Sequence, residues 1–104
     1  MSRSPPIRML VLDILKPLEP SLVDLARTLA RAKGVDGVNL VVYEVDKKTE
    51  TIKATIMGSN IDFNDVRKRV EEFGAVIHSI DGVSVGKKFV REVKTPQDVL
   101  LRVP

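Results

Sequence analysis

Cysteine and tryptophan are absent from this sequence of 104 residues, and histidine occurs once. Without cysteine the chain has no disulfides, no thiolate metal ligands and no cysteine nucleophile. Aromatic residues make up only 4% of the chain, which leaves few rings on which nucleic acid bases could stack. No apolar run approaches the roughly 20 residues of a membrane-spanning helix. A membrane partner is therefore not expected.

Charged residues make up 30% of the chain, and the net charge is only +3 at pH 7. The basic residues occur in short groups with acidic residues between them, a pattern more typical of solvated surface than of a nucleic acid interface. Nucleic acid is thus a disfavoured partner, and a weak association through Lys87, Lys88 and Arg91 stays an alternative. One Gln, three Asn and abundant Lys, Arg and Glu are the composition of thermostable proteins.

The hydrophobic pattern predicts four strands and two helices. A long apolar run bounded by prolines indicates a buried central strand, and two branched segments around a polar turn indicate a hairpin. Apolar residues at spacings of three and four predict two amphipathic helices. The expected strands are Ile7–Lys16, Gly37–Asp46, Thr51–Met57 and Ala75–Ile80, and the expected helices cover residues 21–33 and 62–73.

Both helices carry recognisable start and stop residues. Ser21 and Asp62 are suited to cap the two N-termini, and Gly34 and Gly74 follow the last turns, where a positive φ is common. The order β-α-β-β-α-β then predicts an α+β fold, a ferredoxin-like sandwich. Its antiparallel sheet has the order 4-1-3-2, with both helices on one face.

A single domain is expected over residues 1–104, because 104 residues fit one modest core. The ferredoxin-like core covers about residues 7–82, with a turn or bulge at Asp81-Gly82. Residues 83–104 are a C-terminal extension, in which a short helix over residues 98–102 or a docked tail is expected. The N-terminal residues lack the pattern of a secretory signal, so a cytoplasmic location is expected.

Acidic residues gather where the first two strands end. These strands run parallel, so Asp13, Glu44 and Asp46 are expected at one end of the sheet, with Glu19 on the following loop. Carboxylate oxygens are the ligands of Ca²⁺ and Mg²⁺, and these two ions are the candidate cofactors. The alternative is that the acids are solvated or paired with lysines, namely Lys16, Lys47 and Lys48.

His78 is the single histidine, and it lies on the fourth strand. That strand is antiparallel to the first, which places His78 near Asp13 and makes His78 and Glu19 candidate ligand-binding residues. Ser79 follows His78, but neighbours on a regular strand point to opposite faces. A serine nucleophile activated by His78 is therefore not expected, and no catalytic residue is assigned.

Several segments together resemble the archaeal domain-of-unknown-function family 211. They are LVLDILKPLEPS, GVDGVNLVVYEVD, the IDF helix start, VIHSIDGVSVGKK and VKTPQD. The resemblance implies a ferredoxin-like fold, an archaeal cytoplasmic setting and assembly into homo-oligomers. It implies no activity and transfers no catalytic residues.

The second strand supports self-association independently, because residues 38–43 form an uncharged, branched edge that would aggregate unless covered. The extension adds further apolar residues. We therefore expect a non-enzymatic homo-oligomeric module that binds a small ligand or a divalent cation. The alternative is a small enzyme with a site at a subunit junction that uses Asp13 and His78.

Overall fold

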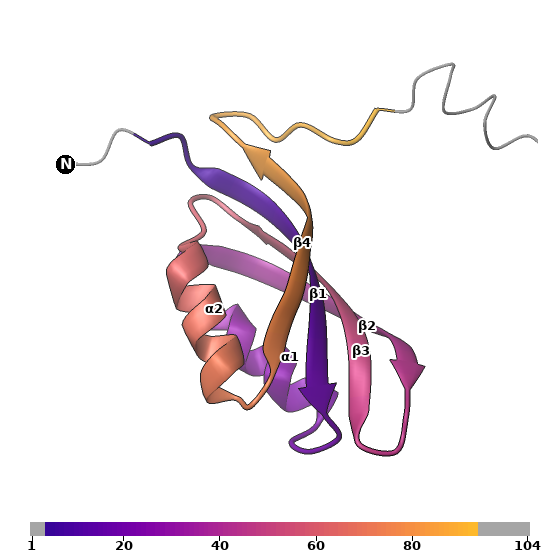
Figure 1. Ribbon diagram of the computed structural model, residues 1–104. Helices are drawn as coiled ribbons and strands as arrows, with labels where there is room; N and C mark the ends of the chain where they lie inside the picture. Colours follow the sequence, from indigo (N-terminus) through magenta and orange to yellow (C-terminus); the bar gives the residue numbers. More distant parts are fainter. Residues whose placement is uncertain (1–3, 94–104) are drawn as a thin grey trace, which may run out of the picture.

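The computed structural model describes residues 4–93 and contains the expected β-α-β-β-α-β order (Figure 1). The short helix expected over residues 98–102 lies outside the described residues. The strands are β1 (Ile7–Pro17), β2 (Val35–Val45), β3 (Thr49–Gly58) and β4 (Val76–Val85), and the helices are α1 (Leu22–Ala30) and α2 (Phe63–Glu72).

The four strands form one antiparallel sheet in the order β2-β3-β1-β4. This is the predicted order, read from the other edge. The most apolar strand, β1, lies between β3 and β4, so both of its backbone edges are hydrogen bonded. The two outer strands, β2 and β4, form the edges of the sheet.

The hydrophobic core lies between one face of the sheet and the two helices. Alternate residues of β1 and β3 point into it, as period-two alternation requires. The helices supply Leu25 and Leu29 from α1, and Val66 and Val70 from α2, all fully buried. The sheet residues are Leu10, Leu12, Ile14, Ile52, Ala54 and Ile56, each at most 2% exposed. Both predicted apolar helix stripes are thereby confirmed.

The helix starts are formed by the predicted caps. The Ser21 hydroxyl accepts a hydrogen bond from the Asp24 N–H at 3.3 Å, and the Asp62 carboxylate accepts one from the Asp65 N–H at 3.1 Å. The Asp65 carboxylate in turn accepts the Lys33 N–H at 2.8 Å. The chain leaving α1 is thus held against the first turn of α2.

Two glycines permit the backbone crossing beside that contact. Gly34 has a φ of +83°, and a Cβ there would lie 1.9 Å from the Asn60 carbonyl oxygen. A Cβ on Gly58 would lie 2.0 Å from the Gly34 carbonyl oxygen. The connections before β2 and after β3 therefore approach more closely than any side chain would allow.

The fourth strand is longer than the sequence pattern indicated, because it continues to Val85. Residues 83–85, expected in the extension, belong to the sheet. The pairing with β1 shifts where Val11 faces Gly82 and Leu12 faces Ile80, which leaves Asp81 as the extra residue of a bulge. Of the two conformations expected at Asp81-Gly82, the bulge is the one present.

Within residues 4–93, neither helix is long and apolar enough to span a bilayer.

The open face of the sheet as candidate functional site

The sheet face opposite the helices is the candidate site, and we call it the open face. Neither α1 nor α2 packs on it, since both contribute to the single core on the other side. It carries the remaining alternate side chains of the two central strands. These are Met9, Val11, Asp13 and Leu15 from β1, and Thr51, Lys53, Thr55 and Met57 from β3.

A hollow of about 210 Å³ lies in the open face, lined by Asp13, Leu15, Thr51 and His78. The sequence prediction that Asp13 and His78 become neighbours is therefore matched by the geometry. Asp13 also faces Lys53 directly across the β1–β3 pair. The hollow thus combines a carboxylate, an imidazole and a hydroxyl above an apolar side chain.

His78 reaches this hollow through an irregularity in β4. Asp13 is paired with Ser79 and Ile14 with Ile77, so His78 is the extra residue of a second bulge. A bulge can re-aim a side chain. The expectation that His78 and Ser79 point to opposite faces assumed a regular strand, and the pairing of β4 with β1 is irregular at this point.

The Ser79 hydroxyl is nevertheless not directed to His78. It donates a hydrogen bond of 2.7 Å to Oδ1 of Asp81. A hydroxyl held by a carboxylate two residues away is not activated by a histidine base, which requires its own hydrogen bond to the nucleophile. In the described residues the Ser79 hydroxyl is thus engaged with Asp81.

Asp46, one of the three candidate metal ligands, closes the β2–β3 hairpin. Its carboxylate accepts the N–H groups of Lys48 and Thr49, each at 2.9 Å, and the Thr49 hydroxyl at 3.1 Å. These hydrogen bonds hold the pKa of Asp46 below its ordinary value of 3.8. The largest contribution comes from the Lys48 N–H, and the Thr49 N–H and hydroxyl contribute next. These bonds give Asp46 a structural role in the turn.

The other two carboxylates, Asp13 and Glu44, lie on strands that are not neighbours in the sheet. Glu44 pairs with Thr51, whereas Asp13 pairs with Lys53, so β3 separates them by two strand spacings, about 9.5 Å. In residues 4–93 no three His, Asp or Glu side chains are grouped closely enough to hold a metal. Binding of Ca²⁺ or Mg²⁺ by Asp13, Glu44 and Asp46 stays a prediction, and one chain does not assemble the three ligands.

Glu19 is exposed in the loop between β1 and α1 and does not line the hollow. Sequence reasoning missed Thr51 and Leu15, which do line it. Both could have been found, because the antiparallel register that pairs β1 with β3 places Leu15 opposite Thr51. Hydrophobic alternation identified the strand, but the register was needed to identify the neighbour.

In the alternative interpretation Lys16 is a partner of the acidic residues at the strand ends, and in the structure it is completely buried. Its Nζ lies 2.7 Å from Oε1 of Glu50 and donates to the carbonyl oxygens of Pro17 at 2.7 Å and Leu18 at 3.0 Å. The ammonium group therefore organises the end of β1 rather than the candidate site.

The sequence was compared with known proteins. Residues 8–99 match the model of family DUF211, described as "Uncharacterized ArCR". The chain belongs to this family.

A curated relative of this DUF211 chain is the uncharacterised protein MJ0319 of Methanocaldococcus jannaschii. The two are 53% identical over 92 residues, which cover 88% of this chain and 95% of the relative. The match therefore extends over nearly the whole length of both chains. Neither description names an activity.

Proposed function

We propose that this DUF211 protein is a non-enzymatic, homo-oligomeric module that binds a small ligand in the hollow of its open face. The observation that carries the proposal is the hollow itself, where Asp13, Thr51 and His78 converge on a sheet face that neither α1 nor α2 covers. Convergent polar groups in a concave, partly apolar surface are typical of ligand sites.

Exposed apolar side chains around the hollow support self-association. Leu15 is 40% exposed, Val41 46% and Val76 49%. Val76 pairs with Leu15 across the β1–β4 ladder, so these two form a continuous apolar strip. The edge strand β2 adds eleven residues whose outer backbone groups face no other described strand.

A second copy of the chain is the occupant that fits this surface. Asp13 on β1 is paired with Lys53 on the neighbouring strand β3. Among residues 4–93, neither side chain forms an ion pair. A surface that carries both charges side by side is complementary to itself after a two-fold rotation. Each Asp13 can then pair with Lys53 of the second copy.

Light scattering of the full chain tests the assembly. We expect a mass that is a multiple of 11.5 kDa at micromolar concentration. Val41→Glu should reduce that mass while keeping the fold, because the new carboxylate faces Lys53 across the strands. Val23→Glu is the matched control, since Val23 is 57% exposed on α1, away from the open face. A wild-type mass of one chain, or an unchanged mass for Val41→Glu, would refute self-association through this surface.

A thermal-shift panel of metal ions and metabolites tests ligand binding, since a ligand of the folded state raises Tm. We expect a stabilising compound whose effect is abolished by Asp13→Asn and by His78→Ala. Glu19→Gln, outside the hollow, should leave the effect intact. An effect that survives both hollow variants would place the ligand elsewhere.

The alternative is a small enzyme whose site forms at the subunit junction. It is favoured by one observation, the shared position of Asp13 and His78 in the hollow. A carboxylate beside an imidazole is a common acid–base arrangement. Turnover of a stabilising compound that is lost with His78→Ala would favour the enzyme over the binding module.

A further inference from the structure

A second cavity lies on the open face, beneath the segment that follows β4. We call residues 86–93 the strap. Gly86 begins it with a φ of +128° and donates its N–H to the Pro6 carbonyl oxygen at 2.9 Å. Farther along, the Val90 N–H donates to the Ser84 hydroxyl at 3.2 Å. Ser84 is only 5% exposed, so the strap covers this part of β4.

The cavity between the strap and the sheet has a volume of about 480 Å³. This falls within the roughly 300–1,000 Å³ of small-molecule sites, and it is more than twice the volume of the hollow at His78. Four of its lining residues are apolar: Met9, Val83, Val85 and Val90. Its walls therefore suit the hydrocarbon part of a ligand.

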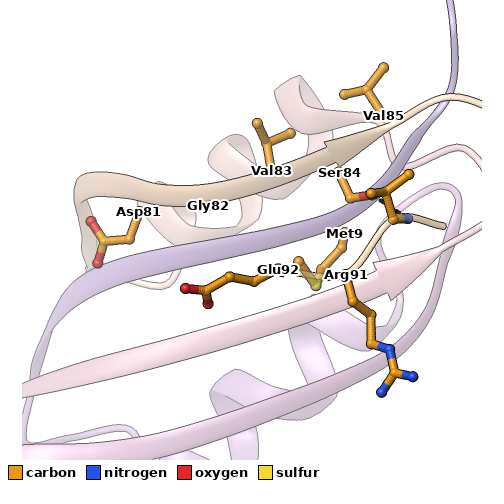
Figure 2. Close-up of a pocket in the computed structure, with 9 residues that line it drawn as sticks. Met9, Asp81, Gly82, Val83, Ser84, Val85, Arg91 and Glu92 are labelled. Atoms are coloured by element: carbon orange, nitrogen blue, oxygen red, sulfur yellow. Dashed lines mark hydrogen bonds between the residues drawn. The ribbon is translucent and has the colours of Figure 1, made fainter. Parts of the chain in front are cut away.

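Two carboxylates give the cavity its charge. Asp81 and Glu92 both line it, and in Figure 2 the Glu92 side chain extends toward the Asp81 end. The Arg91 guanidinium extends the opposite way, so it does not neutralise them. Neither carboxylate is in an ion pair with any residue of the described part of the chain, and Oδ2 of Asp81 accepts no hydrogen bond there.

We propose that this cavity binds an aliphatic primary ammonium compound. The methylene chain would pack on Met9 and Val90, and the ammonium group would donate its hydrogen bonds to Asp81 and Glu92. An ammonium group has three N–H donors, and the oxygens of two carboxylates can accept their hydrogen bonds. A bare metal ion fits less well, because residues 4–93 offer no group of three ligands and the cavity is far larger than an ion.

Titration of the ¹⁵N-labelled full chain with three probes of equal length tests the proposal. The probes are hexylammonium chloride, hexanol and sodium hexanoate. Hexylammonium should bind about ten-fold more tightly than hexanol, because it adds charge-assisted hydrogen bonds, and hexanoate should bind most weakly. The shifted amides should be those of residues 82–85 and 90–92. Equal affinities for hexylammonium and hexanol, or shifts confined to other residues, would overturn the proposal.

Variants separate recognition of the charge from the shape of the cavity. Asp81→Asn combined with Glu92→Gln should weaken hexylammonium binding about ten-fold and leave hexanol binding unchanged. Asp81→Asn also changes the group that accepts the Ser79 hydrogen bond. Unchanged hexanol binding would show that the cavity is nevertheless intact. The matched control is Asp36→Asn with Glu72→Gln, two exposed carboxylates outside the cavity. A control that weakens hexylammonium as much as the cavity variant would show non-specific charge attraction, which also overturns the proposal.

Discussion

Lys16 and Glu50 face each other across the β1–β3 pair and form a 2.7 Å ion pair in which the lysine side chain is wholly inaccessible to solvent. The ammonium group makes two more hydrogen bonds, to the Pro17 and Leu18 carbonyl oxygens. A buried charge is tolerated when its hydrogen bonds are satisfied and its partner is close. The pair therefore fixes the direction in which the chain leaves the sheet toward α1.

Removing one member of this pair should destabilise the fold strongly. Glu50→Ala leaves the Lys16 ammonium buried without its counter-charge, which costs about 3–5 kcal/mol at fully buried sites. Because the Glu50 side chain is 19% exposed, the expected loss is toward the lower end of that range. Urea denaturation measures the change. The double variant Lys16→Met/Glu50→Leu should recover much of the stability, and a double variant as unstable as Glu50→Ala would contradict this account.

Gly58→Ala should destabilise the protein more than Gly37→Ala. A Cβ on Gly58 meets the Gly34 carbonyl oxygen at 2.0 Å, whereas a Cβ on Gly37 meets nothing within 4 Å. Both glycines lie in strands of the β2–β3 hairpin, so loss of backbone freedom in the unfolded chain is the same in both variants. Thermal melting compares them. Equal melting temperatures would show that the backbone crossing at Gly34 is not closely packed.

Stability should fall in acid partly through Asp46 and Asp65. The Lys33 N–H, followed by the Arg69 side chain, holds the pKa of Asp65 below its ordinary value of 3.8, as the hairpin N–H groups do for Asp46. A carboxyl group with a lowered pKa contributes stability that is present above about pH 3.8. That stability is lost as pH falls through the folded-state pKa.

Melting temperatures measured from pH 6 to pH 2.5 test this linkage. Asp65→Asn and Asp46→Asn should each be less stable than wild type at pH 6 and should lose less stability on acidification. Asp36→Asn is the control, because Asp36 is exposed and makes no hydrogen bond with its side chain in the described residues. If the melting temperatures of the wild type and the two variants fell equally with pH, these carboxylates would not be the source of the acid sensitivity.

Val70→Asp should abolish cooperative folding. Val70 is fully buried between α2 and the sheet, and the new carboxylate would find no cation there. Lys68→Asp, on the exposed side of the same helix, should melt close to wild type. Circular dichroism during heating measures both. Retention of a cooperative transition near the wild-type temperature by Val70→Asp would contradict the packing of α2 on this face.

Much of the fold was determined by local sequence. The spacing of Leu25 and Leu29, the Ser21 and Asp62 caps and the long apolar run of β1 each specify one element, because they act over a few residues. Once the order of elements is known, right-handed crossovers leave few arrangements of the sheet. The order β2-β3-β1-β4 followed from that restriction.

The candidate sites were decided by tertiary structure. The bulge at His78 turns its side chain into the hollow with Asp13, and no local pattern in VIHSI indicates where pairing with β1 slips. The Asp46 carboxylate accepts hydrogen bonds within the hairpin, and the buried Lys16 has its ion-pair partner 34 positions away. Charge and polarity can be read along the chain. The neighbours that determine what a charged group does depend on strand register, which is set by the packing of the whole sheet.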